Sequence, residues 1–345
     1  MKPDSTWKAP PLVVWGAGAM GGSIGAALVR EGVDVLFVDK AREHVRAMNE
    51  RGLRITGPVS EFTVPAKAWE PSALSGRFPL IFLCVKAHHT GEALTQLEPH
   101  LAEDGAVVSI QNGLCELEIA EALGAGRTVG AFVNFGADFL EPGVVHRGNR
   151  GATVVGEIDG NVTGRVRGIH SLLCHFEPRA ILTDNIFGFL WGKLAYAALL
   201  FATALTDESI ADVLAGREFR PLLTALAGEV VAVAAARGVC LEAFDGFSPD
   251  AFRRGGGPEL AEASLDDLVS FNRASAKTHS GIWRDLAVRK RTTEVDAQLG
   301  WVTRIGRDLN VPTPLTLAVI RQVHQIESGE RSQTWDNLRE LGASS

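Results

Sequence analysis

The stretch Val13-Val14-Trp15-Gly16-Ala17-Gly18-Ala19-Met20-Gly21 decides the fold of the first half of this chain. A short apolar run, Leu12 to Trp15, leads into the pattern G-x-G-x-x-G, and a helical pattern follows from Met20 to Arg30. In such a strand–turn–helix unit the first glycine allows the tight turn, the second lets the backbone approach a pyrophosphate, and the third lets helix and strand pack closely. The sequence therefore predicts a dinucleotide site on Gly16, Gly18, Ala19, Met20 and Gly21.

An acidic residue ends the next predicted strand, Val35 to Val38. Asp39 lies 23 residues beyond Gly16, close to the roughly 20 expected of an acid that binds the adenosine ribose. A carboxylate there favours NAD(H), whereas Lys40 and Arg42 could neutralise the 2′-phosphate of NADP(H). Asp39 could instead be a helix N-terminal charge for the stretch that begins at Arg42. These residues leave the choice of dinucleotide open.

Strand and helix patterns alternate through the rest of the first half, which indicates βαβ units and a mostly parallel sheet. We expect further strands at Leu80 to Cys84, Ala106 to Ser109 and Thr128 to Phe132, and helices at Arg42 to Arg51, Gly91 to His100 and Leu117 to Leu123. From Phe135 to Glu157 short strands are broken by turns, which we interpret as a meander that closes the first domain.

The second half has an almost wholly helical pattern. Helices are expected at Ile186 to Leu205, Pro221 to Arg237, Leu260 to Ala276, Thr293 to Asp308 and Leu315 to Glu327. Gly238 follows the second of these as a C-cap would. We therefore predict an α/β protein in which a Rossmann-type doubly wound domain, residues 10–182, precedes an all-helical domain, residues 183–340.

Composition narrows the classes of partner. The 345 residues are 46% apolar and 22% charged, with a formal net charge of −7, which gives no global attraction to nucleic acid or to an anionic membrane. The uncharged stretch Leu194 to Thr206 is far shorter than the roughly 20 residues that span a bilayer. We expect no nucleic-acid or membrane partner and a small-molecule substrate.

The four cysteines form no C-x-x-C motif and are interpreted as reduced core thiols in a cytoplasmic protein; they are Cys84, Cys115, Cys174 and Cys240. No grouping of His, Asp or Glu has the spacing of metal ligands, and hydride transfer from a nicotinamide needs no metal.

Four further motifs follow the predicted elements. Their order and spacing resemble the ketopantoate reductase (2-dehydropantoate 2-reductase) family over nearly the whole chain; the motifs are Val85-Lys86-Ala87, Gln111-Asn112-Gly113, Trp191-Gly192-Lys193-Leu194 and Thr293-Glu294-Val295-Asp296. The resemblance implies a dinucleotide-binding domain followed by a helical domain, with the active site in the cleft between them. It also implies reduction of a 2-oxo acid, usually by NADPH, as in the conversion of ketopantoate to pantoate on the way to pantothenate and coenzyme A.

The resemblance gives roles to particular residues. Lys193 would be the catalytic lysine and Glu294 the active-site glutamate, both touching the substrate. Lys86 and Asn112 would contact the cofactor, and Asn112 the substrate as well. The chemistry is sound in its own right, because hydride arriving at a ketone carbon leaves an alkoxide that a lysine can stabilise and protonate. Without the resemblance, Lys193 reads as a surface lysine whose stem lies along apolar groups.

The chain departs from the family pattern on the helix of the lysine. Where the family presents substrate-binding asparagines one and two turns on, this sequence has Ala197 and Phe201, on the same helix face as Lys193. The alternative substrate is therefore a larger or more apolar 2-oxo acid, or a 3-oxo acid. We assign Ala197 and Phe201 to the substrate-binding surface.

A second departure lies in the segment Ala276 to Trp283, of which only Ser280 clearly matches the family's substrate-contacting serines. His279 and Trp283 are candidates for the cleft, and a structural role explains each of them equally well. The cluster Arg289-Lys290-Arg291 is most simply a solvated turn before the next helix, and the alternative is a role in binding substrate carboxylate or cofactor phosphate.

A non-catalytic sensor that responds to a dinucleotide is a third possibility, which retention of both Lys193 and Glu294 disfavours. The sequence leaves a homodimer and the physiological direction of the reaction open.

Overall fold

The computed structural model describes residues 11–274 and 278–343. The chain divides into two compact units, residues 1–186 and 187–345. Pro10, where the first domain was expected to begin, and Ala276, where one helix was expected to end, lie outside the described residues.

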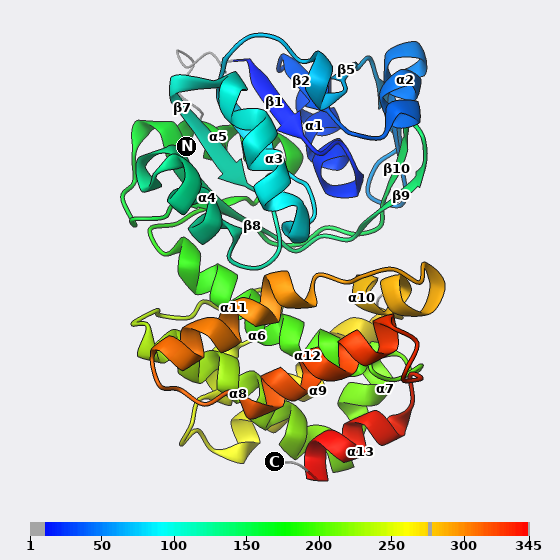
Figure 1. Cartoon of the computed structure of the whole chain (residues 1–345), viewed down its shortest axis with the longest axis vertical. Helices are drawn as coiled ribbons and strands as arrows, with labels where there is room; N and C mark the ends of the chain where they lie inside the picture. Colours follow the sequence, from blue (N-terminus) through cyan, green and yellow to red (C-terminus); the bar gives the residue numbers. More distant parts are fainter. Residues whose placement is uncertain (1–10, 275–277, 344–345) are drawn as a thin grey trace. The chain divides into compact units, whose positions relative to one another are not determined.

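The first unit is built on a sheet of eight strands in the order β12-β11-β8-β7-β6-β1-β2-β5 (Figure 1). The strands from β8 to β5 are parallel, and β11 runs antiparallel to β8. Their bounds are β1 Leu12–Trp15, β2 Val35–Val38, β5 Lys67–Trp69, β6 Phe78–Leu83, β7 Leu101–Ser109, β8 Thr128–Val133, β11 Thr153–Glu157 and β12 Ile181–Leu182. The β1 residues are all buried, as a strand covered on both faces requires.

Helices cover this sheet in two groups. One group is α1 (Ala19–Arg30) with α5 (Gly164–Phe176), and the other is α3 (Thr90–Leu97) with α4 (Cys115–Leu123); the members of each group pack on each other (Figure 1). A further helix, α2 (Arg42–Arg51), follows β2 and packs on β5. The expected doubly wound α/β architecture is confirmed.

The expected meander is wrong in its pairing. The hairpin of β9 (Ala137–Glu141) and β10 (Val144–Arg147) joins β3 (Leu53–Thr56) and β4 (Phe62–Val64) in a separate sheet of order β4-β3-β10-β9, which packs on α1. The next strand, β11, returns to the main sheet instead. The turn at Glu141-Pro142-Gly143 is present, and Gly143 has φ +83°, a left-handed conformation that suits glycine.

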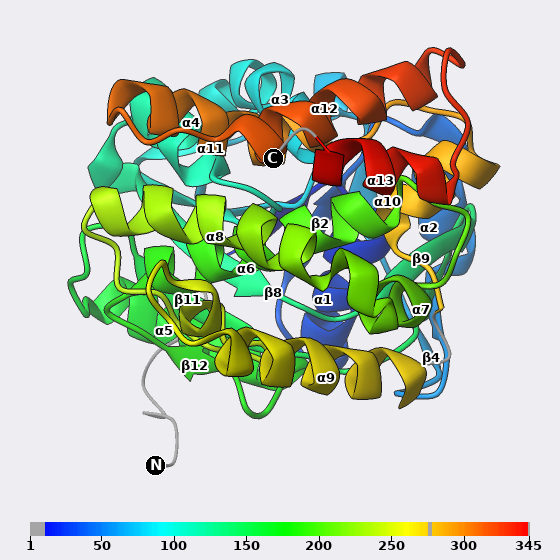
Figure 2. The ribbon, with the colours of Figure 1, turned by 90° about the horizontal axis from the view of Figure 1, so that it is seen from below.

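The described part of the second unit is helical. Its elements are α6 Ile186–Thr203, which begins at the last residue of the first unit, α7 Ile210–Ala215, α8 Arg220–Ala236, α9 Pro258–Ala274, α10 Gly281–Trp283, a π-helical turn Arg284–Val288, α11 Val295–Asp308, α12 Pro314–Glu327 and α13 Trp335–Ala343. Figure 2 shows α8 between α9 on one side and α11 and α12 on the other, and α8 contacts all three. Gly238, with φ +78°, follows α8, and its N–H bonds back to the carbonyl of Ala235.

Two helical segments of this unit, Ile186–Thr203 and Arg217–Ala236, are long and apolar enough to cross a membrane by length and composition alone. Within the protein 83% and 67% of their most apolar windows are buried. Packing against the other helices therefore accounts for their apolar character.

Candidate active site

The register of the main sheet brings the predicted residues of the first unit to one edge. Trp15 pairs with Val38 on one side and with Leu83 on the other, and Leu83 pairs with Ser109. Because these strands are parallel, the segments that follow them emerge at the same carboxyl edge, where open α/β sheets bind ligands. Four of the predicted site residues lie in those segments: Gly16, Asp39, Lys86 and Asn112.

The glycine turn has the geometry that a dinucleotide requires. Gly16 has φ +96°, and a Cβ there would lie 2.8 Å from the backbone nitrogen of Val85. A Cβ on Gly21 would overlap the carbonyl oxygen of Gly16 and come within 2.9 Å of Val14 Cγ1. By contrast, a Cβ on Gly18, the N-cap of α1, would meet nothing within 4 Å. The first and third glycines therefore serve packing, and the second leaves open space at a helix N-terminus, where a phosphate fits.

Asp39 has an observed partner. Its Oδ1 accepts a hydrogen bond of 2.9 Å from the N–H of Ala41, the residue before α2. This contact supports the alternative interpretation of Asp39 as a residue that stabilises the start of α2. That contact uses one carboxylate oxygen and fixes the side chain at the end of β2, so Oδ2 can still accept a hydrogen bond from a ribose hydroxyl.

The two cations beside Asp39 lie in exposed ion pairs. Arg42 Nε is 3.1 Å from Glu70 Oε1, and Lys40 Nζ is 3.9 Å from Glu92 Oε2 and 3.4 Å from His89 Nε2. Exposed pairs of this kind contribute about 0–1 kcal/mol. A phosphate could displace either carboxylate at small cost.

The loops after β6 and β7 are tied to each other by Gln111. Its Nε2 donates to the carbonyl of Val85 at 3.0 Å and to Thr90 Oγ1 at 2.9 Å. These two bonds hold the half-buried Lys86 and Asn112 on neighbouring loops. Gln111 belonged to a quoted motif without a role of its own, and the structure gives it this positioning role.

Helix α6 carries the predicted lysine. Lys193 is the one charged residue among its 18 residues, and it is half-buried between buried neighbours. Ala197 lies one turn on and is buried, and Phe201 is fully buried at 0% exposure. Phe201 can touch a ligand only if the side chains that cover it move, so its assignment to the substrate surface stays a prediction.

A polar pair on α6 and α9 was not found from the sequence. The Tyr196 hydroxyl lies 3.5 Å from Asn272 Nδ2, and both residues are buried. Burial raises the pKa of the Tyr196 phenol; the bond from Asn272 opposes this shift and the charge of Asp245 adds to it. Tyr196 follows Lys193 by three residues and so shares its helix face, which places a neutral hydroxyl and an amide near that face. The sequence offered one signal for this pair: Tyr196, the single tyrosine of the chain, lies three residues beyond Lys193.

Glu294 is the half-buried N-cap residue of α11. The residue before it is held at both ends: the N–H of Thr293 donates to Glu327 Oε1 at 2.7 Å, and Thr293 Oγ1 accepts from the N–H of Val295 at 3.3 Å. These bonds set the backbone from which the Glu294 side chain projects.

Ser280 is the buried N-cap of α10, and its Oγ accepts a 3.1 Å bond from the N–H of Trp283. The hydroxyl hydrogen can still be donated. The rings of His279 and Trp283 lie against each other with centroids 4.0 Å apart and planes tilted by 35°. Ala276 and Lys277 of the same segment lie outside the described residues.

The residues of the cluster Arg289-Lys290-Arg291 are all exposed, as the interpretation of a solvated turn expects. The two arginines also form ion pairs: Arg289 Nη1 and Arg291 Nε each lie 3.0 Å from Oδ1 of Asp285, a buried residue of the π-helical turn. The arginines neutralise a carboxylate that would otherwise be costly to bury.

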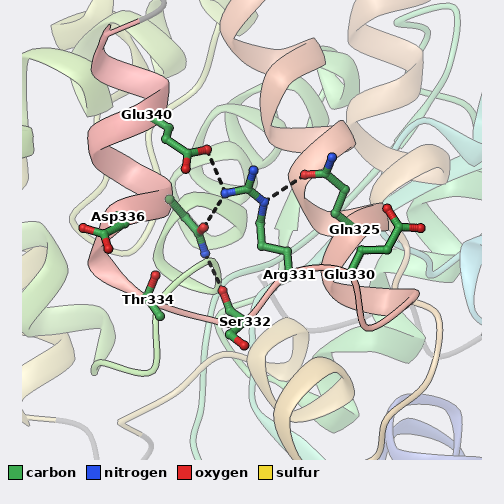
Figure 3. A pocket seen from close by; sticks show the side chains of 8 residues that line it. Gln325, Glu330, Arg331, Ser332, Thr334, Asp336 and Glu340 are labelled. Carbon is green, nitrogen blue, oxygen red and sulfur yellow. Dashed lines mark hydrogen bonds and ion pairs between the residues drawn. The ribbon is translucent and has the colours of Figure 1, made fainter.

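A polar hollow between the end of α12 and α13 is separate from all the predicted site residues (Figure 3). Its central cation, Arg331, donates to Gln325, Asn337 and Glu340 at 2.7–2.8 Å. Within residues 11–274 and 278–343 no group of three or more His, Cys, Asp or Glu side chains could hold a metal ion. None of the four cysteines forms a disulfide, but the expectation of core thiols is wrong for Cys240, which is exposed; Cys115 is buried, and Cys84 and Cys174 are half-buried.

Comparisons with known proteins agree with this arrangement. Residues 12–160 match the family profile "Ketopantoate reductase PanE/ApbA", and residues 185–327 match "Ketopantoate reductase PanE/ApbA C terminal". A 2-dehydropantoate 2-reductase of Streptococcus pyogenes is 25% identical over 92% of this chain and 98% of its own length. That of Pyrococcus horikoshii is 33% identical over 53% of this chain and 59% of its own length.

Solved structures show the same fold. The PanE/ApbA family ketopantoate reductase of Ralstonia eutropha has a TM-score of 0.77 at 25% identity, covering 92% of this chain and 99% of its own. A D-mandelate dehydrogenase with NADH and anilino(oxo)acetate has a TM-score of 0.79 at 21% identity, covering 92% and 98%. With both parts of the family profile matched along the sequence, the chain belongs to the ketopantoate reductase PanE/ApbA family.

Proposed function

We propose that this protein reduces a 2-oxo acid to a 2-hydroxy acid with a nicotinamide dinucleotide. The observation that carries the proposal is Lys193, the one charged residue of an apolar, mostly buried helix. A half-buried ammonium group stabilises negative charge that develops on a ligand better than one in bulk water does. The membership of the chain in the ketopantoate reductase family supports this role.

The reaction assigns work to three side chains. The reduced nicotinamide, when bound, supplies the hydride that the carbonyl carbon receives. Lys193 stabilises the alkoxide that develops on the carbonyl oxygen and gives it a proton from Nζ. Glu294 orients the lysine or accepts from a substrate hydroxyl, and Asn112 donates its amide to the substrate or the nicotinamide.

We infer that NADPH is the natural reductant, with Lys40 and Arg42 turned from their weak ion pairs to the 2′-phosphate. NADH is the alternative that Asp39 supports, and the D-mandelate dehydrogenase of the same fold carries NADH. The ratio of kcat/KM for the two cofactors decides between them.

Replacing Lys193 by Ala tests the assignment. We expect kcat to fall by at least about 10²-fold, the usual contribution of a general acid, while the Kd of the cofactor stays within about twofold. Lys67→Ala is the matched control, because Lys67 lies on β5 in an exposed pair with Asp34. Undiminished turnover in Lys193→Ala would contradict the proposal.

The substrate is ketopantoate or a more apolar 2-oxo acid. Ala197 favours the second candidate, since it presents a methyl group one turn from Lys193. Steady-state assays over ketopantoate, aliphatic and aryl 2-oxo acids discriminate: a kcat/KM for ketopantoate tenfold above the rest excludes the apolar candidate. Cofactor binding without turnover of any oxo acid would instead identify a sensor.

A further inference from the structure

A buried histidine lies against the glycine turn. His44, on the first turns of α2, is 1% exposed. Its Nε2 lies 2.9 Å from the carbonyl oxygen of Ala17, the residue between the first two glycines. Its Nδ1 lies 2.9 Å from the backbone nitrogen of Gly143, in the β9–β10 turn. One side chain therefore connects the turn, α2 and the second sheet.

The two partners fix the tautomer of this ring. The N–H of Gly143 can only donate, so Nδ1 carries no proton and accepts. The carbonyl of Ala17 can only accept, so Nε2 carries the proton and donates. The neutral Nε2–H form satisfies both bonds, and both are buried, where an unmade bond is expensive.

The bond to Ala17 sets the direction of the next N–H. A trans peptide is planar, so its C=O and its N–H point in opposite directions. With the Ala17 oxygen directed at α2 and His44, the N–H of Gly18 points to the other side of the turn. Gly18 is the N-cap of α1 with open space around it, and N–H groups at this position bind phosphate.

We propose that His44 is a positioning residue for the cofactor, which orders the Ala17–Gly18 peptide before the pyrophosphate arrives. This rests on the proposed function only in that the chain binds a nicotinamide dinucleotide. His44 touches neither substrate nor reacting atoms, so its effect falls on cofactor affinity and leaves the chemical step alone.

Two variants separate the two bonds of the ring. His44→Asn keeps an acceptor near the place of Nδ1 but is too short to reach Ala17. His44→Gln can place an amide N–H where Nε2 was. Phe139→Ala is the packing control, because the Phe139 ring lies edge-on against His44, with centroids 4.9 Å apart, and makes no bond to the turn.

The measurement is the Kd of NADPH, NADH and ADP-ribose by calorimetry, together with kcat and the KM of the cofactor. For His44→Asn we expect both the cofactor Kd and the ADP-ribose Kd to rise about five- to tenfold, the size of one hydrogen bond. The kcat at saturating cofactor should stay within about twofold. His44→Gln and Phe139→Ala should bind within about twofold of the unaltered protein.

Equal Kd values for His44→Asn and the unaltered protein would overturn the proposal, and so would an equal loss in Phe139→Ala. A failure of the unaltered protein to bind either dinucleotide would refute the proposed function instead. If His44→Asn does not fold, His44→Gln decides: a loss of affinity above tenfold with unchanged thermal stability contradicts the role given to Nε2.

Discussion

Single residues of the glycine turn divide their work between folding and binding. Gly21 has no room for a Cβ, since Gly16, Val14 and Cys84 surround it, whereas Gly18 has open space. Glycine is therefore needed at position 21 for packing, whereas at position 18 packing does not require it. Substituting each glycine separately distinguishes an effect on stability from an effect on cofactor binding.

We expect Gly21→Ala to destabilise the protein by about 1–3 kcal/mol, the cost of overpacking a close contact. Gly18→Ala should leave the free energy of unfolding within about 0.5 kcal/mol, because a Cβ at this position meets nothing within 4 Å. Its new methyl group should nevertheless raise the cofactor Kd by at least about tenfold, since the backbone must approach the pyrophosphate. Urea unfolding and calorimetric titration check both. A Gly18→Ala variant that binds normally would remove this glycine from the site.

The candidate site residues named from the sequence lie in local motifs: Gly16 and Gly18 in the glycine spacing, and Lys193 in its own motif. The contacts that the sequence did not reveal join distant residues. His44 is bonded to Gly143, 99 residues away, and Tyr196 lies against Asn272, 76 residues away. No periodicity in the chain records such pairings.

Among the elements, buried parallel strands were predicted best. The expected bounds of β1 and β2 agree with the structure residue for residue, because strands buried on both faces are continuous apolar runs. The strands β3, β4 and β5 were missed, since each has only three or four residues and includes an exposed position. Pairing β10 with β3 spans about 90 residues of chain, which turn signals alone do not specify.

The end of β10 contributes a buried cation to the first unit. Arg147 lies over the ring of Phe176, 3.9 Å from its centroid, and its Nη2 is 3.7 Å from Glu177 Oε2 just beyond α5. Burial, with the neighbouring Arg150, lowers the pKa of Arg147 to about 10, and Glu177 opposes that shift. The Glu177 carboxylate therefore stabilises the positive charge of Arg147, which would be unfavourable at this buried site without a counter-charge.

We expect Glu177→Gln to destabilise the protein by about 3 kcal/mol, because it leaves Arg147 buried without a counter-charge. Arg147→Met should cost less, since methionine packs well on aromatic rings and Glu177 keeps Arg150, 3.1 Å away. The midpoints of urea unfolding rank the two variants. The reverse order would show that the aromatic contacts of Arg147, and not its ion pair, stabilise this junction.

At the scale of the whole molecule, a ligand of the first unit is expected to raise the stability of the protein. Cofactor at 100 times its Kd should add about 2.7 kcal/mol to the free energy of unfolding, by mass action. Calorimetric scans with and without cofactor measure the rise in the unfolding midpoint. Gly18→Ala is the control and should show a reduced rise. An unchanged midpoint in the unaltered protein at saturating cofactor would contradict binding to the native state.

The apolar helices α6 and α8 affect what happens to the protein after it unfolds. In the native state their neighbours cover most of them. Unfolding of the second unit exposes two helical segments to water that are as apolar as membrane-spanning helices. Such segments associate with other unfolded chains and so favour aggregation over refolding. Heat inactivation should then be irreversible and faster at higher protein concentration, so the shelf life of this enzyme is set by how often the helical unit opens and not by its equilibrium stability.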